Sequence, residues 1–175
     1  MPRPPQIPIR RPQPGRKATA AQQSQAQVAA LMQQGLTLLQ QGQLTQAKQM
    51  YEQVLAKQPR HFDALHLLGV IAAQSNDPAL AVELISRAIA LKPDYAEAYC
   101  NRGVVLKELR RMEEAVASCD RAIAIKPDFV EAYSNRGLAL QELNRVEEAL
   151  ASYDRAIALK PDYAEAYSNR GLALQ

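Results

Sequence analysis

The sequence predicts an all-α solenoid, in which antiparallel helix pairs stack into a right-handed superhelix. Three observations lead to this fold class. Glycines recur at one constant interval, at Gly35, Gly69, Gly103, Gly137 and Gly171. Prolines keep the same period, at Pro59, Pro93, Pro127 and Pro161. The unit that begins at Ala96 matches the unit from Val130 at 23 of 34 positions. A fixed period of this length is the signature of stacked helix-turn-helix units.

The period divides the chain into a tail, four complete units and part of a fifth. Residues 1–27 are rich in Pro and Arg and then in Gln, carry no acid, and are expected to be disordered. The complete units span 28–61, 62–95, 96–129 and 130–163. The first is divergent and polar, as a capping repeat should be. Residues 164–175 would form only the first helix of a fifth unit. We therefore expect either a longer native protein or self-association through this open helix.

Residues at the same position of successive units are called a column here. Several columns resemble those of the tetratricopeptide repeat (TPR) family over residues 28–175. Large residues stand at Leu31, Leu65, Tyr99, Tyr133 and Tyr167, and small ones at Ala47, Ala81, Ala115 and Ala149. A mainly aromatic column holds Tyr51, Ile85, Cys119 and Tyr153. The chain departs from the family pattern at Arg102, Arg136 and Arg170, where Leu usually precedes Gly. The resemblance implies a concave groove lined by the first helices of the pairs.

Local signals predict where the helices begin. Asp94, Asp128 and Asp162 each stand three residues before a Glu, which is the spacing of an N-terminal capping box. Asp77 precedes Pro78 and predicts a capped helix with proline in its first turn. Asn144 is expected to cap the second helix of its unit. Each mid-helix glycine costs about 1 kcal/mol against Ala, and close helix packing best explains its presence.

Composition excludes several classes of function. The net charge is +3, but Arg3, Arg10, Arg11, Arg16 and Lys17 lie in the tail, and the remainder is slightly acidic. A basic face with stacking aromatics is missing, so we expect no nucleic-acid partner. No apolar run approaches the roughly 18 residues of a membrane helix, and no secretory signal is visible. A membrane partner is therefore not expected, and a cytoplasmic location is.

The chemistry-bearing residues do not form a catalytic pattern. The two cysteines, Cys100 and Cys119, suit a reducing compartment, and Cys119 falls in the buried column as a small core residue. His66 and Cys100 share a column of successive units, but a metal would require more ligands. We expect no catalytic residue, no cofactor and no metal.

The most informative polar column is Asn101, Asn135 and Asn169. An Asn carboxamide both donates and accepts hydrogen bonds, so it can bind a peptide backbone whatever its side chains. The column resembles the asparagine ladder of the O-linked N-acetylglucosamine transferase superhelix, which holds extended polypeptide. The alternative is that these amides pack between helices or face solvent.

Neighbouring columns are expected to complete the groove. They hold Glu97, Glu131 and Glu165, together with His66, Ser134 and Ser168. Without Lys or Arg in these columns, a carboxylate clamp for acidic C-termini is excluded. The acids favour a ligand that tolerates positive charge.

The predicted function is therefore a non-catalytic scaffold that binds an extended polypeptide in its groove. The alternative is the N-terminal recognition arm of a larger glycosyltransferase of the O-linked N-acetylglucosamine transferase type, whose catalytic domain lies outside this chain.

Overall fold

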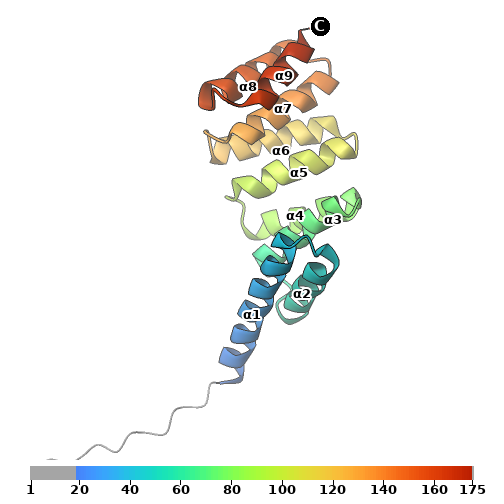
Figure 1. Ribbon diagram of the computed structural model, residues 1–175, viewed down its shortest axis with the longest axis vertical. Helices are drawn as coiled ribbons and strands as arrows, with labels where there is room; N and C mark the ends of the chain where they lie inside the picture. Colours follow the sequence, from blue (N-terminus) through green and yellow to red (C-terminus); the bar gives the residue numbers. More distant parts are fainter. Residues whose placement is uncertain (1–18, 175) are drawn as a thin grey trace, which may run out of the picture.

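The computed structural model describes residues 19–174, and within them the chain is a stack of helix pairs (Figure 1). The first helices of the pairs are α1 (Ala20–Gln40), α3 (Phe62–Gln74), α5 (Ala96–Glu108), α7 (Val130–Glu142) and α9 (Ala164–Ala173). The second helices are α2 (Leu44–Lys57), α4 (Pro78–Leu91), α6 (Met112–Ile125) and α8 (Val146–Leu159). The described residues form no strand, and the predicted all-α fold is confirmed.

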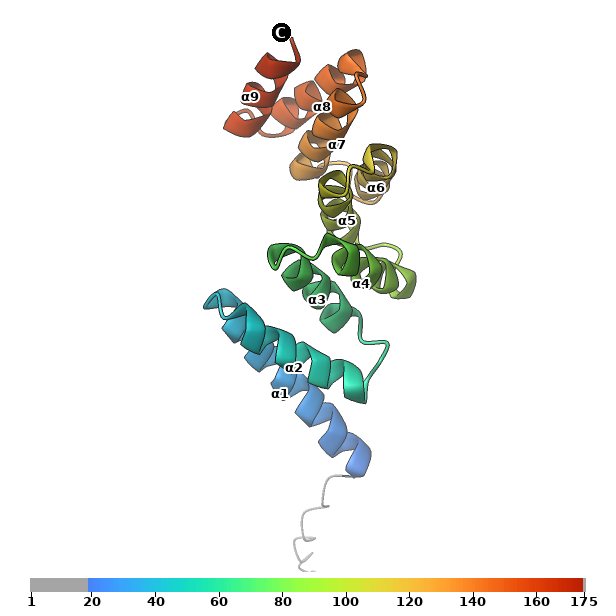
Figure 2. The same ribbon diagram turned by 90° about the vertical axis from the view of Figure 1, so that its right-hand side faces the viewer.

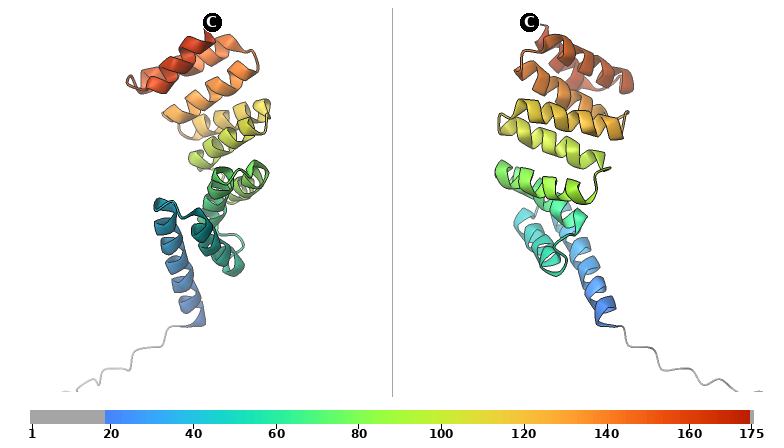
Figure 3. Two further views of the ribbon diagram at one scale, coloured as in Figure 1. Left: turned by 45° about the vertical axis from the view of Figure 1, so that its right-hand side comes forward. Right: turned by 180° about the vertical axis from the view of Figure 1, so that it is seen from behind.

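The pairs follow one another along the long axis of the molecule (Figure 2). The two helices of a pair contact each other, and each second helix also contacts the first helix of the next unit, so the core is built in successive clusters. Views from two further sides show the same stack, with α1 extending beyond its partner toward the N-terminal end (Figure 3). None of the helices within residues 19–174 combines the length and hydropathy needed to cross a membrane.

The recurrent glycines mark where the two helices of a pair touch. A Cβ on Gly35 would lie 2.7 Å from Cε1 of Tyr51, and one on Gly103 would lie 2.8 Å from Sγ of Cys119. The partners on the second helices are the buried column Tyr51, Ile85, Cys119 and Tyr153, each fully buried. Burial of one such side chain contributes roughly 1.5–3 kcal/mol. The expectation that these glycines allow close packing is confirmed for the first four units.

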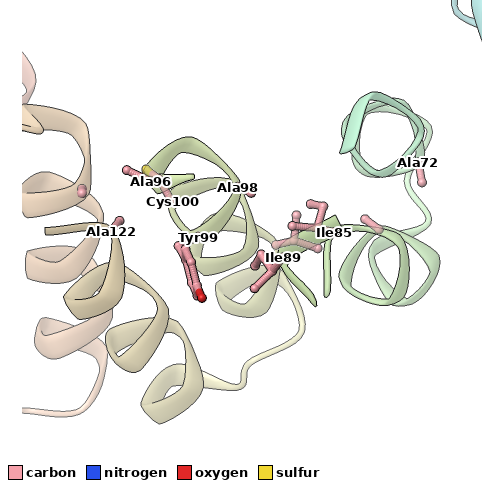
Figure 4. Packing of buried hydrophobic residues seen from close by; sticks show 11 residues of the cluster. Ala72, Ile85, Ile89, Ala96, Ala98, Tyr99, Cys100 and Ala122 are labelled. Atoms are coloured by element: carbon pink, nitrogen blue, oxygen red, sulfur yellow. The ribbon is translucent and has the colours of Figure 1, made fainter. Parts of the chain in front are cut away.

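Adjacent pairs are joined by interleaved apolar side chains. In the central cluster, Ile85 and Ile89 of α4 lie between α4 and α5, with Tyr99 of α5 in the same layer (Figure 4). Cys119 is buried as expected, and burial raises the pKa of its thiol to about 12. Burial likewise raises the pKa of the Cys100 thiol to about 11. Both sulfurs therefore stay protonated at neutral pH and act as small apolar groups.

The N-terminal helix begins earlier than the sequence indicated. Residues 20–27 were expected to belong to a disordered tail, but α1 starts at Ala20. Thr19 and Gln22 form a reciprocal capping box, with the Gln22 amide nitrogen donating to Thr19 Oγ1 at 3.3 Å. The segment that follows contains Ala and Gln, which favour helix, and no proline. The rest of the predicted tail, residues 1–18, lies outside the described residues.

The predicted N-caps are right in one case and wrong in the others. Asp77 caps α4, and its Oδ1 accepts from the Leu80 amide at 3.2 Å. In contrast, Tyr95, Phe129 and Tyr163 occupy the N-cap positions assigned to Asp94, Asp128 and Asp162, without a side-chain cap bond. The reason is the preceding proline, which is favoured at the second position of a tight turn and leaves Asp at the third. The Phe129 amide closes one such turn on Lys126 O at 3.1 Å.

The turns inside the pairs share a left-handed residue that sequence reasoning missed. Gly42, Asn76, Arg110 and Asn144 occupy the same position of successive units and have φ values of 73°, 60°, 59° and 55°. Asn144 is therefore a turn residue rather than the predicted cap, and Arg145 takes the N-cap position of α8. Arg110 is the unusual member, because a left-handed backbone costs an ordinary residue with a Cβ about 1–2 kcal/mol.

We expect Gly69→Ala to destabilise the protein by about 1–3 kcal/mol. The new Cβ would lie 2.5 Å from Cγ1 of Ile85, whose β-branched side chain cannot readily move. Gly171→Ala is the matched control, because nothing lies within 4 Å of its added Cβ. Urea unfolding measures both, and an equal loss in the two variants would contradict close packing as the role of the glycine.

We expect Arg110→Asn to raise the free energy of unfolding by about 0.5–1 kcal/mol, because Asn tolerates the left-handed turn better than Arg. The exposed ion pair between Arg110 and Glu142, at 3.1 Å, is lost but contributes little. The reciprocal change Asn76→Arg should lower stability by a similar amount. If thermal unfolding moves in the same direction for both variants, turn strain is not the cause.

Candidate functional site

The surface along α1, α3, α5, α7 and α9 is called here the first-helix face. A pocket of about 250 Å³ opens on it between α3 and α5. Apolar side chains of Val70, Ala73 and Val104 line the pocket, and Asn101 and Glu108 supply its polar groups. An apolar hollow with a few polar groups is the usual form of a binding site.

The pocket is one part of a longer apolar stripe. The residue after each glycine points along this face, and none of the five is buried. The members are Leu36, Val70, Val104, Leu138 and Leu172. Leu36 and Leu172 at the two ends are 39% and 57% exposed. The first-helix face therefore exposes apolar side chains along most of the stack.

The asparagine column connects the first helices to one another. Asn101 Nδ2 lies 3.0 Å from Nε2 of His66, which joins α5 to α3. Asn135 Nδ2 donates to Sγ of Cys100 at 3.6 Å, which joins α7 to α5. Nδ2 of Asn169 is buried and has no hydrogen-bond partner within the residues described. Two of the three amide nitrogens thus bond between helices, which was the alternative left open by the sequence.

His66 lies in an aromatic cluster at the α3 end of this network. Its ring stacks on Phe62 with centroids 6.0 Å apart and meets Tyr95 edge-on at 5.5 Å. Lys92 Nζ covers the cluster, 5.3 Å from the Phe62 ring and 4.9 Å from the Tyr95 ring. The cluster holds the imidazole in place beside Asn101. Sequence reasoning named His66 but missed its aromatic neighbours.

Burial makes His66 a poor base in the folded protein. Desolvation lowers the pKa of its imidazole, and the nearby Asp63 and Glu97 carboxylates oppose this shift only in part. Nε2 must be unprotonated to accept from Asn101. The neutral imidazole is therefore the form that completes the bond between α3 and α5.

The predicted acidic column is present but partly neutralised. Glu97 pairs with Lys126 at 3.7 Å, and both side chains are about half exposed. Glu165 accepts a hydrogen bond from the Tyr163 hydroxyl at 2.8 Å, while Glu131 is exposed on α7. The face therefore keeps acidic groups, but their charge is weaker than the sequence alone indicates.

The remaining predicted groove residues differ in accessibility. Ser134 is only 1% exposed, whereas Ser168 on α9 is exposed. A residue not anticipated, Lys107, enters the site between α5 and α7, where its Nζ donates to Oδ1 of Asn135 at 3.5 Å. Burial lowers the pKa of this ammonium group. Lys107 occupies the same column as Ala73. Its side chain therefore fills, between α5 and α7, the place that corresponds to the pocket between α3 and α5.

Among residues 19–174, no group of three or more His, Cys, Asp and Glu side chains is arranged to hold a metal ion.

The stacked helix pairs and the shared columns define a helical-repeat protein. Family models for the tetratricopeptide repeat match residues 32–96, 96–129, 118–151 and 141–175. The chain belongs to the tetratricopeptide repeat family. No curated protein sequence matches it significantly.

Solved TPR structures show the same architecture. The crystal structure of the MamA protein is 26% identical, covers 84% of this chain and 80% of its own, and superposes with a TM-score of 0.78. The Arabidopsis OM64 TPR domain is 30% identical over 64% of this chain and 93% of its own, with a TM-score of 0.63.

YrrB, described as a TPR protein with an unusual peptide-binding site, is similar in fold. It is 24% identical and covers 82% of this chain and 74% of its own, with a TM-score of 0.76. These likenesses show the TPR fold that the chain shares with them.

We expect the folded protein to lose stability as the pH falls from about 6.5, the ordinary pKa of His. The folded state has the lower His66 pKa, so the unfolded state binds more protons in this range and is favoured by acid. His66→Gln keeps an acceptor for Asn101 without the titration. Urea unfolding between pH 7 and pH 5 should therefore give a smaller loss for the variant, and parallel curves would contradict this role.

Proposed function

We propose that the first-helix face binds an extended polypeptide segment, with an apolar ligand side chain in the pocket between α3 and α5. The observation that carries this proposal is the pocket of about 250 Å³ beside Asn101. Its lining from Val70, Ala73 and Val104 suits an aliphatic or aromatic side chain.

The bond to His66 orients the Asn101 carboxamide for this role. Because Nδ2 is held by Nε2 of the imidazole at 3.0 Å, the amide plane is fixed before any ligand arrives. Within residues 19–174 no donor is recorded for Oδ1 of Asn101. This oxygen can accept from a backbone N–H of the ligand. A pre-ordered acceptor binds with less loss of side-chain entropy than a mobile one.

The repeat spacing matches an extended ligand. Packed helices lie about 8–10 Å apart, and an extended chain advances about 3.3 Å per residue. About every third ligand residue would then meet the next first helix. The proposed contacts beyond Asn101 are Asn135 and Asn169, with Glu131, Glu165 and Ser168 beside them. Glu97, paired with Lys126, lies at the edge of this surface.

The charge of the face favours a segment with basic residues between its apolar ones. Glu131 and Glu165 are exposed, and Asp63 lies near His66. The nearby lysines are already engaged, since Lys107 bonds to Asn135, Lys126 pairs with Glu97 and Lys92 covers the aromatic rings beside His66. The alternative function, a recognition arm of a glycosyltransferase, would use the same surface to bind its polypeptide substrate. It differs only in a catalytic domain outside this sequence, so we propose the scaffold as the function.

We expect Ala73→Leu to weaken peptide binding at least tenfold, because the larger side chain fills the pocket beside Asn101. The probe is a peptide selected on the wild-type protein from a random twelve-residue display library, with affinity measured by isothermal titration. Ala124→Leu, an exposed site on α6, is the matched control and should leave the affinity unchanged. Circular dichroism confirms that each variant folds.

Asn101→Ala tests the polar half of the same site. A single lost hydrogen bond of about 0.5–1.5 kcal/mol should weaken binding several-fold. Selected peptides that bind wild type, Ala73→Leu and Asn101→Ala equally well would contradict the proposed site.

A further inference from the structure

The surface along α2, α4, α6 and α8 is called here the second-helix face. A row of arginines reaches toward it from the first helices. They are Arg102, Arg136 and Arg170, which stand immediately before the recurrent glycines on α5, α7 and α9. Their guanidinium groups bond to side chains of α6 and α8, and so point away from the first-helix face.

Two of the three arginines pair with an aspartate of the preceding unit. Arg136 Nε donates to Asp120 Oδ1 at 2.6 Å, and its Nη1 donates to Ser152 Oγ at 2.7 Å. Arg170 Nε donates to Asp154 Oδ1 at 2.5 Å. Asp120 and Asp154 occupy the same column of successive units. Each pair joins a first helix to the second helix of the preceding unit.

The third arginine has no such partner. The column position that serves Arg102 is Ser86, because Ser86 lies one full repeat before Asp120. Within residues 19–174, Arg102 Nε donates to Ser118 Oγ at 3.1 Å, and the guanidinium lies 5.3 Å from the centre of the Tyr99 ring. No ion pair to Arg102 is recorded among the residues that the structure describes. Burial lowers the pKa of its guanidinium, and the nearby Glu114 carboxylate opposes this shift only in part.

A pocket surrounds this guanidinium. Its volume is about 200 Å³, and Ser86, Arg102 and Ser118 line it together with the apolar Val82, Leu106 and Ala117. Glu114 and Arg111 also line the pocket, but these two bond to each other through two contacts of 2.6 and 2.7 Å. The pocket therefore holds one positive charge in excess, with hydroxyl groups and carbon surface around it.

We propose that this pocket is a second binding site, which takes the carboxylate of an acidic side chain from a partner protein. The neighbouring units show the chemistry, since an Asp carboxylate fills the corresponding position at Arg136 and Arg170. Guanidinium and carboxylate form strong charge-assisted hydrogen bonds. The apolar lining favours a carboxylate on a carbon stem over a free inorganic anion. The site is independent of the first-helix face.

Nuclear magnetic resonance of ¹⁵N-labelled protein tests the proposal at the Arg102 Nε–H group. The probes are acetyl-Leu-Asp-Leu-amide, its Asn counterpart and inorganic phosphate. A saturable shift of the Arg102 signal with the Asp peptide alone supports the site. The Arg136 signal is the internal control and should not move, because that guanidinium is already paired. No saturable shift, or an equal shift with phosphate at the same concentration, overturns the proposal.

Two variants complete the test. Ser86→Asp supplies the missing carboxylate from within, so it should raise the melting temperature above that of Ser86→Asn and weaken Asp-peptide binding roughly tenfold or more. Arg102→Gln should abolish the binding while the protein remains folded. If Ser86→Asp is no more stable than Ser86→Asn, or still binds the peptide as tightly as wild type, a carboxylate does not fit the pocket.

Discussion

The close contact between the two helices of each pair is the constraint on which the rest of the structure depends. Glycine on the first helix lets a large or polarisable side chain of the second helix lie against its backbone, as Gly35 does for Tyr51. Side chains that pack into grooves at this close contact favour one crossing angle, and this angle decides which residues face outward. Both surfaces of the stack, and the pockets on them, follow from this repeated contact.

Much of the fold is visible in the sequence because it repeats. Glycine, alanine and proline columns identify the pairs, and the helices α3, α5, α7 and α9 begin at the first residues of the units. The failures are local. Asp128 lies in the turn that follows Pro127 and does not cap α7. Asn144 adopts the left-handed backbone of a turn and does not cap α8. These choices depend on backbone geometry that residue type alone does not specify.

The candidate site was only partly predictable, since a column says which residues share a face but not what each contacts. Asn101 and Asn135 were named for a ligand, yet their amide nitrogens bond to His66 and Cys100. Lys107 was overlooked because its column is otherwise apolar or neutral. The informative signals were Ser86, which stands in a column with Asp120 and Asp154, and Ala73, the smallest side chain in the column of Lys107. Each of these two residues lines a pocket.

Two features distinguish the joint between the second and third units. On the first-helix face, the neutral imidazole of His66 bonds to Asn101 across the joint. On the second-helix face, Arg102 lacks the aspartate partner that Arg136 and Arg170 have at the later joints. In a stack that is held together only by neighbouring contacts, each joint resists tension through its own bonds. When the protein is pulled along its long axis, the joint between the second and third units therefore lacks one of the bonds that resist separation at the later joints.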